Sequence, residues 1–511
     1  MFLLINKVFS RFRGQSLNYI KNYKYGNVTT SIKYWLIGGI KLDQVIVSQL
    51  ENIVGSERVS TDPAVLASYS RCMYLPRVHS ARPQCVVRPK EVNEIQRILH
   101  IANNYKIPVY LYTAAQSDAW YPLEGGILLD LSGMNRIIEI NTEQRYAVIE
   151  PGVTQGQLWR ELKKRGMTAA FWSAPPGAAV LSNYLEQGWP DKPDTGLTSD
   201  NVISLEVVLP TGEILRTGSA AQFGEWWMRH GTIPDLTGLF IGAQGTLGVV
   251  TKMSIRIFDE PEVREVVVCG TDTVPDLVKL LKYICKKKIG VGAECRSKET
   301  LKLFLHDKWY ENCTSNHLCA VTLWGDRQQV DHEKELLDKI VDAKTIRYEP
   351  GVGDISSSSG RAPNPEGVTE FIYMKGSRTC PCCWMPGLDP WLKVLPYGLN
   401  RMKELGLLPT YTGAPAFHGR FSYIRFFFYF DESDPKSVET AMKEAAKMKQ
   451  WMLEQKYLLR VSLANSRMMV GRLAGGVYYE FLKRIKQTVD PNNIMSPGHL
   501  GFSGGLYVPE Y

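Results

Sequence analysis

Two periods of apolar residues run along the chain, and each predicts one kind of element. Helical spacing occurs at residues 42–55, 92–103, 156–166, 274–287 and 435–455. Short apolar runs bounded by turn residues predict strands at 83–89, 107–112, 125–132, 147–152, 247–258, 264–270, 317–325 and 424–430. Because strand-like and helix-like blocks alternate from Cys85 onward, an α+β or α/β domain is expected over about residues 60–257.

Composition places the chain among ordinary globular proteins. It has 511 residues, of which 44% are hydrophobic and 22% are charged. That length suits about two to four domains. The densest apolar run, residues 424–430, is far shorter than the roughly 20 residues that a membrane-spanning helix requires, and this argues against a transmembrane protein.

The net charge of +8 is distributed unevenly. Basic residues without any acid occupy positions 1–40, namely Lys7, Arg11, Arg13, Lys21, Lys24 and Lys33. The rest of the chain is close to neutral, which argues against nucleic-acid binding. The pattern favours an atypical extension at residues 1–40 over two alternatives, an organelle-targeting segment and a membrane-surface arm. Ten cysteines without a convincing secretory signal indicate reduced thiols and a cytoplasmic protein.

Several common cofactor and metal motifs are missing from the sequence. It contains no Walker motif and no G-x-G-x-x-G after a strand, which argues against phosphoryl transfer and NAD binding. H-E-x-x-H and paired C-x-x-C motifs are missing as well. Cys380, Cys382 and Cys383 could ligate a metal, but a single three-cysteine cluster is a weak signal, so no metal site is predicted.

Six phrases in order provide a more specific signal. They are VVRPKEVNEIQRILHIANNYKIPV, LEGGILLDLSGMNRIIEIN, YAVIEPGVTQGQLWRELKKRG, DNVISLEVVLPTGEILRTG, GAQGTLGVVTKMSIRI and VDPNNIMSPG. Together they resemble the FAD-binding oxidoreductases of the vanillyl-alcohol oxidase / p-cresol methylhydroxylase superfamily. The resemblance implies an α+β protein in which a two-part FAD-binding domain of the p-cresol methylhydroxylase type carries an α/β cap domain.

The same resemblance divides the chain. After the extension at 1–40, it implies an FAD-binding domain at 41–257 and a cap or substrate domain at 258–430. The remaining residues, 431–511, would complete the cap and return to the FAD-binding domain as a helical segment.

Three FAD-binding segments are implied by the resemblance. The pyrophosphate loop would comprise Thr113, Ala114, Ala115, Gln116, Ser117 and Asp118. The isoalloxazine segment would contribute Pro176, Gly177 and Asn183, and the adenine segment would contribute Gly245, Gly248, Val249 and Val250. Alanines replace the usual glycines of the first loop, so its path is expected to differ. Gln116 replaces the histidine that commonly attaches the flavin, so we expect non-covalent FAD.

Candidate catalytic residues lie in the C-terminal half. A reduced flavin gains negative charge that a nearby cation stabilises, and loss of a hydride from an alcohol carbon requires a base or an anion-stabilising group. The candidates are His418, Tyr423, Arg425 and Arg467. Strand alternation places residues 421, 423 and 425 on one face. Each candidate could instead be an ordinary packing or surface residue.

Three functions remain open from the sequence. The leading prediction is a flavoenzyme that takes a hydride from an alcohol-like or phenolic substrate and passes electrons to oxygen, a quinone or a protein subunit. The second is a 2-hydroxy-acid dehydrogenase subunit of the glycolate or D-lactate type, although the H-x-G-D-G-N and G-E-H-G segments usual in that branch are missing. The third is a family member that has lost FAD. A homodimer is a further possibility.

Overall fold

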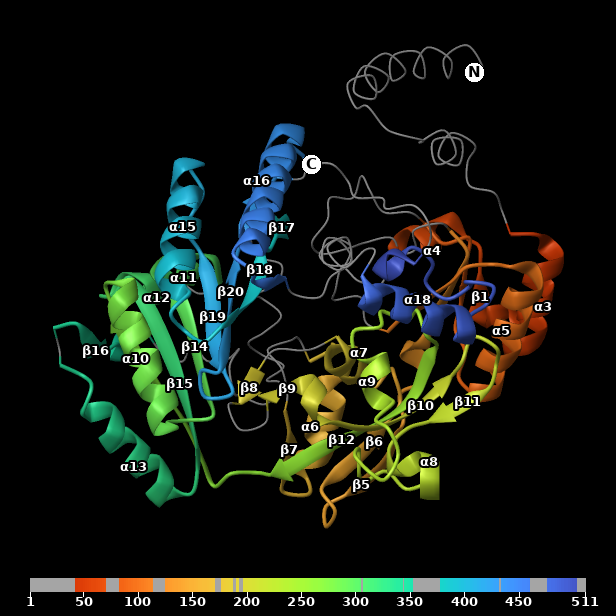
Figure 1. Cartoon of the computed structure of the whole chain (residues 1–511), viewed down its shortest axis with the longest axis horizontal. Coiled ribbons are helices and arrows are strands. Elements are labelled where there is room, and N and C mark those ends of the chain that lie inside the picture. The colour runs from red at the N-terminus through yellow and green to blue at the C-terminus, as the bar shows by residue number, and fades with distance from the viewer. Residues whose placement is uncertain are drawn as a thin grey trace. The chain divides into compact units, whose positions relative to one another are not determined.

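The computed structural model has the expected α+β fold, with three main sheets and flanking helices (Figure 1). The structure describes residues 42–69, 82–113, 125–170, 176–186, 190–192, 196–304, 307–342, 344–352, 377–431, 433–459 and 476–502. All elements below belong to the unit Gln44–Tyr511, which is separate from the unit Met1–Asp43.

The first sheet has four strands in the order β1-β2-β4-β3, of which β2, β4 and β3 run parallel. Its strands are β1 (Val59–Ser60), β2 (Cys85–Val87), β3 (Val109–Tyr112) and β4 (Ile127–Asp130), and helices α3 (Gln44–Val54), α4 (Pro63–Ser68) and α5 (Val92–Tyr105) accompany them. Parallel strands are joined by a crossover connection, and α5 forms the crossover between β2 and β3. Its side chains Ile95, Ile98 and Leu99 are buried. Helix α5 follows the predicted periodicity.

The second sheet is antiparallel, in the order β11-β10-β12-β6-β5, and β7 pairs with the far end of β12. Its strands are β5 (Ile137–Asn141), β6 (Tyr146–Ile149), β7 (Met167–Ala169), β10 (Val202–Val208), β11 (Ile214–Arg216) and β12 (Val249–Asp259). The nearby helices are α6 (Gln155–Lys163), α7 (Val180–Leu185), α8 (Ser219–Phe223) and α9 (Thr237–Phe240). Side chains of α6 and α7 pack on this sheet in one hydrophobic core.

The third sheet has eight strands in the order β16-β13-β15-β14-β19-β20-β18-β22. These are β13 (Val263–Thr271), β14 (Gly292–Ser297), β15 (His317–Gly325), β16 (Ile346–Tyr348), β18 (Cys382–Pro386), β19 (Tyr411–Ala416), β20 (Phe421–Phe426) and β22 (Leu458–Leu459). One face forms the largest core with α10 (Val274–Lys287), α13 (Arg327–Asp338), α15 (Trp391–Glu404) and α16 (Pro435–Glu454) (Figure 1). On the other face, α11 (Lys298–Phe304) and α12 (Asp307–Asn312) contribute to a smaller cluster over β13 and β15.

Shorter elements complete the description. They are the strand pairs β8 (Pro190–Lys192) with β9 (Gly196–Leu197) and β17 (Ser377–Thr379) with β21 (Phe428–Phe430), and the helix α18 (Val477–Val489). The single strand predicted at residues 424–430 is therefore wrong in one respect, because the chain leaves β20 at Phe426 and β21 joins a different sheet. Within the described residues, no helix is both long enough and apolar enough to cross a membrane.

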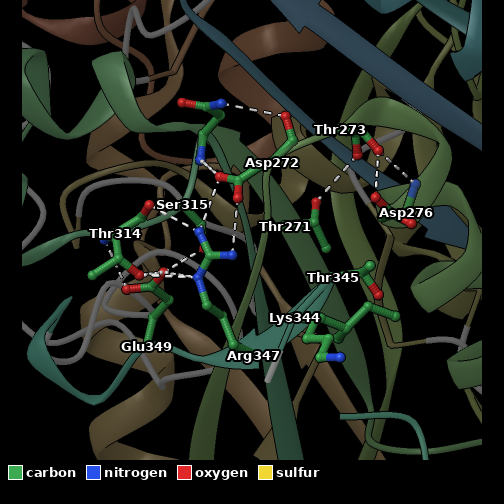
Figure 2. A network of polar contacts seen from close by, with 12 residues as sticks. Thr271, Asp272, Thr273, Asp276, Thr314, Ser315, Lys344, Thr345, Arg347 and Glu349 are labelled. Atoms are coloured by element: carbon green, nitrogen blue, oxygen red, sulfur yellow. Dashed lines mark hydrogen bonds and ion pairs between the residues drawn. The ribbon is translucent and has the colours of Figure 1, made fainter. Parts of the chain in front are cut away.

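An ion-pair network fixes the edge strand β16 (Figure 2). The guanidinium of Arg347 donates to both carboxylate oxygens of Asp272 at 2.9 Å each, and to the hydroxyl of Thr314 at 3.0 Å. The Arg347 guanidinium lowers the pKa of the Asp272 carboxyl. Buried Glu349 accepts from the hydroxyls of Thr314 and Ser315. These partners lie on neighbouring strands and loops, so the network holds the sheet edge together.

Candidate functional site

The adenine segment and the isoalloxazine segment, both predicted to bind FAD, contact each other near β3. We call residues 242–248 the glycine loop. The amide of Gly242 donates to the carbonyl of Leu185 in α7 at 2.7 Å, so the glycine loop lies beside the segment that contains the second set of candidates. Gly245 lies against the side chain of Leu111 in β3. The glycine loop therefore links α7 to the strand that leads into the predicted pyrophosphate loop.

The two predicted glycines of this region are required for different reasons. Gly245 has a φ of 71°, and a Cβ atom there would lie 3.2 Å from the Oγ atom of Ser496. Gly248 has a φ of 148°, and a Cβ atom there would lie 2.7 Å from the carbonyl oxygen of Val208. Gly248 thus permits β12 to approach β10, whereas Gly245 permits the glycine loop to approach β3 and the chain near Ser496.

The other predicted flavin residues have varied surroundings. Thr113 follows β3 directly and is partly buried, whereas residues 114–118 lie outside the described residues. Asn183 is half-buried in α7, where its side-chain amide donates to the Ala179 carbonyl at 3.0 Å. Val249 and Val250 are buried in β12, so the backbone is the part of this strand that a cofactor could reach.

The C-terminal turn, residues 490–499, is tied to the glycine loop by a buried ion pair. The ammonium of Lys486 donates to the carbonyls of Thr246 and Met495 at 2.8 Å each, and it contacts the carboxylate of Asp490. Asp490 also accepts from the amide of Met495 at 2.9 Å. Burial lowers the pKa of Lys486, although the neighbouring Asp490 opposes that shift. One charge pair therefore fixes both segments beside β3.

Two of the catalytic candidates, Tyr423 and Arg425, lie on the third sheet, on the face opposite the largest core. Tyr423 clusters there with Cys382, Ala414 and Trp384, all of which come from strands β18, β19 and β20. Arg425 follows Tyr423 by two residues, so alternation places it on the same face, while the next residues of β20 enter the core. Strand β8 lies against β14 and β19. We call this side of β14, β19, β20 and β18 the polar face.

The other two catalytic candidates are placed differently. His418 lies in the turn between β19 and β20 with a φ of 52°, next to Phe417 with a φ of 47°. Left-handed backbone is unusual for such residues, and strained turns of this kind are frequent at functional sites. His418 lies beyond the strand end rather than in the row of Tyr423 and Arg425. Arg467 lies outside the described residues.

Comparisons with known proteins identify two FAD-related domains in the chain and a shared fold. An FAD binding domain matches residues 83–218, and the C-terminal domain of FAD linked oxidases matches residues 464–500. A crystal structure of p-cresol methylhydroxylase with substrate bound superposes with a TM-score of 0.80 at 21% identity, covering 90% of this chain and 97% of the other. The two domain matches indicate FAD binding, and the superposition shows a shared fold.

The matched domains indicate an FAD-linked oxidoreductase, and its fold is similar to that of p-cresol methylhydroxylase.

Curated relatives of this oxidoreductase act on different substrates. Mitochondrial D-lactate dehydrogenase [cytochrome] of Arabidopsis thaliana is 26% identical over 451 residues, covering 82% of this chain and 73% of the relative. Glycolate oxidase subunit GlcD of Bacillus subtilis is 30% identical, covering 41% of this chain and 44% of the relative. The 4-cresol dehydrogenase flavoprotein subunit of Pseudomonas putida is 29% identical, covering 42% and 43%. The chain spans less than half the length of the latter two.

The residues around the isoalloxazine segment suit a flavin. The side chain of Gln155 is buried, and its Oε1 atom has no hydrogen-bond partner within the described part of the chain. Its backbone amide donates to the Ala178 carbonyl at 2.9 Å, which places it beside the predicted segment. Gly177 is exposed, and no atom lies within 4 Å of where its Cβ would stand. An orphaned polar group and an open approach to the backbone both fit a polar, flat ligand.

The sequence analysis did not identify three residues of the polar face, namely Glu294, Arg296 and Thr412. Arg296 in β14 is 1% exposed and donates to the carboxylate of Glu294 at 2.8 Å. Thr412 in β19 is the cross-strand neighbour of both Arg296 and Arg425. No short motif marks these residues, and only the pairing of distant strands brings them together.

Two of the cysteines considered as possible metal ligands, Cys382 and Cys383, face opposite sides of the third sheet. Cys382 belongs to the cluster on the polar face, whereas Cys383 is packed in the largest core on the opposite face. Burial raises the pKa of the Cys383 thiol, which disfavours the thiolate that a metal requires. Among the described residues, no group of three or more His, Cys, Asp or Glu side chains is placed to hold a metal ion.

Proposed function

We propose that this oxidoreductase takes a hydride from an alcohol-like or phenolic substrate at the polar face of its eight-stranded sheet. Bound FAD would supply the hydride acceptor, the N5 atom of the flavin. The observation that carries the proposal is the pair Tyr423 and Arg425, which share one face of β20 while the alternate residues of that strand are in the core. The FAD-binding domain and the shared fold support the reaction class.

The protein side chains would have distinct roles. Tyr423 is 5% exposed, and its hydroxyl would hold the proton of the substrate hydroxyl during hydride loss. The guanidinium of Arg425 would stabilise the negative charge that develops on the substrate oxygen or on the reduced flavin. His418 and Arg467 remain candidates for the same tasks. Thr113, residues 114–118, Gly177, Asn183 and the glycine loop would hold FAD without a covalent bond.

A second candidate is a 2-hydroxy-acid dehydrogenase subunit. The D-lactate dehydrogenase and glycolate oxidase relatives favour it, as does the buried Arg296 on the polar face. For either reaction we propose a cytoplasmic protein whose electrons pass to oxygen, a quinone or a separate protein subunit. The 4-cresol dehydrogenase relative, a flavoprotein subunit, supports the last of these acceptors. A homodimer is compatible with both.

An absorption spectrum and a substrate panel test the proposal. The purified protein should show flavin bands that move into the supernatant after acid precipitation, whereas colour in the pellet would contradict non-covalent binding. Anaerobic bleaching by vanillyl alcohol or p-cresol supports the first candidate, and bleaching only by D-lactate or glycolate supports the second. A protein that stays colourless after incubation with FAD would refute both.

A pair of tyrosine variants tests the assignment of the site. Tyr423→Phe should slow flavin reduction about 100-fold, because general acid–base groups contribute about 10²–10⁴-fold to rates. The matched control is Tyr348→Phe, which removes a hydroxyl at the sheet edge in β16 and should leave the rate unchanged. Equal reduction rates in the two variants would remove Tyr423 from the mechanism.

A further inference from the structure

The start of helix α6 lies directly against the isoalloxazine segment. The backbone amide of Gln155 donates to the carbonyl of Ala178 at 2.9 Å. The amide of the next residue, Gly156, donates to the carbonyl of Pro176 at 2.9 Å. A Cβ atom at Gly156 would lie 3.0 Å from the Cβ atom of Pro176, so glycine permits this close approach. The first residues of α6 are therefore held beside the chain that is predicted to contact the flavin ring.

Gln155 brings a polar side chain into this junction. The residue is 2% exposed, and its Oε1 atom has no hydrogen-bond partner among the residues that the structure describes. Buried side-chain carbonyls nearly always accept a hydrogen bond, so an unpaired one calls for a specific explanation. Helical side chains tilt toward the N-terminus of their helix, and Gln155 is the first residue of α6. We therefore expect its side chain to extend toward the isoalloxazine segment.

The start of α6 offers a ligand an acceptor rather than a set of donors. The first amides of a helix are the usual site for an anion, because they lack partners within the helix. In α6 these amides already have acceptors. Those of Gln155 and Gly156 donate to the isoalloxazine segment. The amide of Gln157 donates to the hydroxyl of Thr154 at 3.2 Å. The group of FAD that fits this position is therefore a donor and not the anionic pyrophosphate.

The flavin ring supplies a donor that matches the Gln155 carbonyl. The oxidised ring carries a single N–H group, at N3, and a buried N–H without an acceptor is costly. Ribityl hydroxyls can donate as well, but a hydroxyl rotates to suit any of several acceptors. The surroundings suit a flat ring, because Val153, Val180 and Leu181 belong to one hydrophobic core. The N3–H group is therefore the donor that most requires a fixed acceptor at this place.

We propose that the side-chain carbonyl of Gln155 accepts a hydrogen bond from the N3–H group of bound FAD. This inference rests on the FAD binding of the proposed function and adds a cofactor-binding residue outside the three predicted segments. The hydrogen bond fixes the orientation of the ring against residues 176–179, because a ring that turned away would leave both the carbonyl and the N–H unpaired. Gln155 takes no part in the hydride transfer itself.

The experiment compares two cofactors in two proteins. FAD-free protein is titrated with FAD and with N3-methyl-FAD, in which a methyl group replaces the N3 hydrogen, while flavin fluorescence is followed. Wild-type protein should prefer FAD over N3-methyl-FAD about tenfold more strongly than Gln155→Met does, because the variant has no acceptor to lose. Methionine is similar to glutamine in length and volume, so the steric effect of the N3 methyl group is common to both proteins and cancels from the comparison.

Three controls separate cofactor binding from a structural role. Gln155→Glu retains an acceptor and should keep the cofactor preference of the wild type. Gln157→Met removes a side-chain amide that donates to the carbonyl of Asn135 at 2.9 Å, and it should keep that preference as well. Without FAD, Gln155→Met should be as stable to heat as the wild type, because the carbonyl has no described partner, and a clear loss of stability would overturn the inference. If Gln155→Met does not fold, Gln155→Leu takes its place.

The outcomes distinguish this inference from the proposed function. An equal cofactor preference in wild type and Gln155→Met would overturn the N3 contact and leave the hydride transfer standing. Weaker binding of both cofactors by Gln155→Met, without a change in preference, would assign the carbonyl to a hydroxyl of FAD and also overturn the N3 contact. A tenfold change in preference, without bleaching by any alcohol, would support the contact and contradict the proposed reaction.

Discussion

Replacement of Lys486 by methionine should disrupt the connection between the C-terminal turn and the glycine loop. Lys486 is 3% exposed and Asp490 is 1% exposed, so the ion pair is shielded from water. The ammonium also donates to the carbonyls of Thr246 and Met495 at 2.8 Å each. Methionine has a similar length and no donor, so Lys486→Met removes the charge and all three contacts while it keeps much of the packing.

The expected loss in the free energy of unfolding follows from the polar groups that stay buried without the Lys486 ammonium. Removal of one partner from a buried ion pair costs about 3–5 kcal/mol, because the other charge stays buried in the protein interior without a counter-charge. The carbonyls of Thr246 and Met495 also lose a charged donor, and an unsatisfied buried group costs about 1–3 kcal/mol. These contributions share one ammonium and are not additive. We therefore expect a loss of about 4 kcal/mol in the free energy of unfolding.

Urea denaturation measures this loss, with tryptophan fluorescence for the fold and flavin fluorescence for FAD release. The matched control is Lys483→Met, one turn earlier in α18, where an exposed ion pair with Glu480 should contribute less than about 1 kcal/mol. FAD should be released at a lower urea concentration in Lys486→Met, since Thr246 belongs to the glycine loop. Equal denaturation midpoints for the two variants would refute the reasoning.

Two other predictions concern pH and backbone geometry. Burial lowers the pKa of His317 from 6.5 to about 4, so between these pH values the unfolded chain binds a proton that the folded chain does not. The free energy of unfolding should therefore fall by about 3 kcal/mol as the pH drops from 6.5 to 4. In urea titrations, His317→Gln should flatten that pH dependence. Gly245→Ala should weaken FAD binding, measured by fluorescence titration, more than Gly166→Ala does. Both glycines have positive φ, but a Cβ at Gly245 would lie 3.0 Å from Leu111 Cδ1, whereas the position at Gly166 is open. Equal FAD affinities would show that the crowding at Gly245 is irrelevant.

The sequence predicted helices best where periodicity and end signals coincide. The expected helix at residues 274–287 agrees with α10, and the one from Pro435 to about Gln455 agrees with α16, which ends at Glu454. In both, a side chain of the preceding residue caps the first turn, and proline occupies an early helical position. Such signals are local, so they can be read without knowledge of the fold.

The strands of the third sheet show where this reading fails. Every residue of 424–430 except Arg425 is apolar or aromatic, and no turn residue marks the end of β20. The chain leaves the sheet after Phe426 because the next strand, β21, pairs with β17 instead. Strand pairing over long sequence separations has no local signal. Arg296 and Thr412 were missed for the same reason, since they become neighbours of Arg425 only through the sheet register.

The structure also explains why two distant phrases of the resemblance belong together. Asp490, from VDPNNIMSPG, accepts from the amides of Ile494 and Met495 and holds the ammonium of Lys486. Lys486 in turn donates to Thr246 of GAQGTLG. The two phrases are therefore halves of one buried polar cluster, and a change in either half removes a hydrogen-bond partner from the other. Because the glycine loop also contacts β3 and α7, the geometry of the flavin segments depends on residues near the C-terminal end of the described chain.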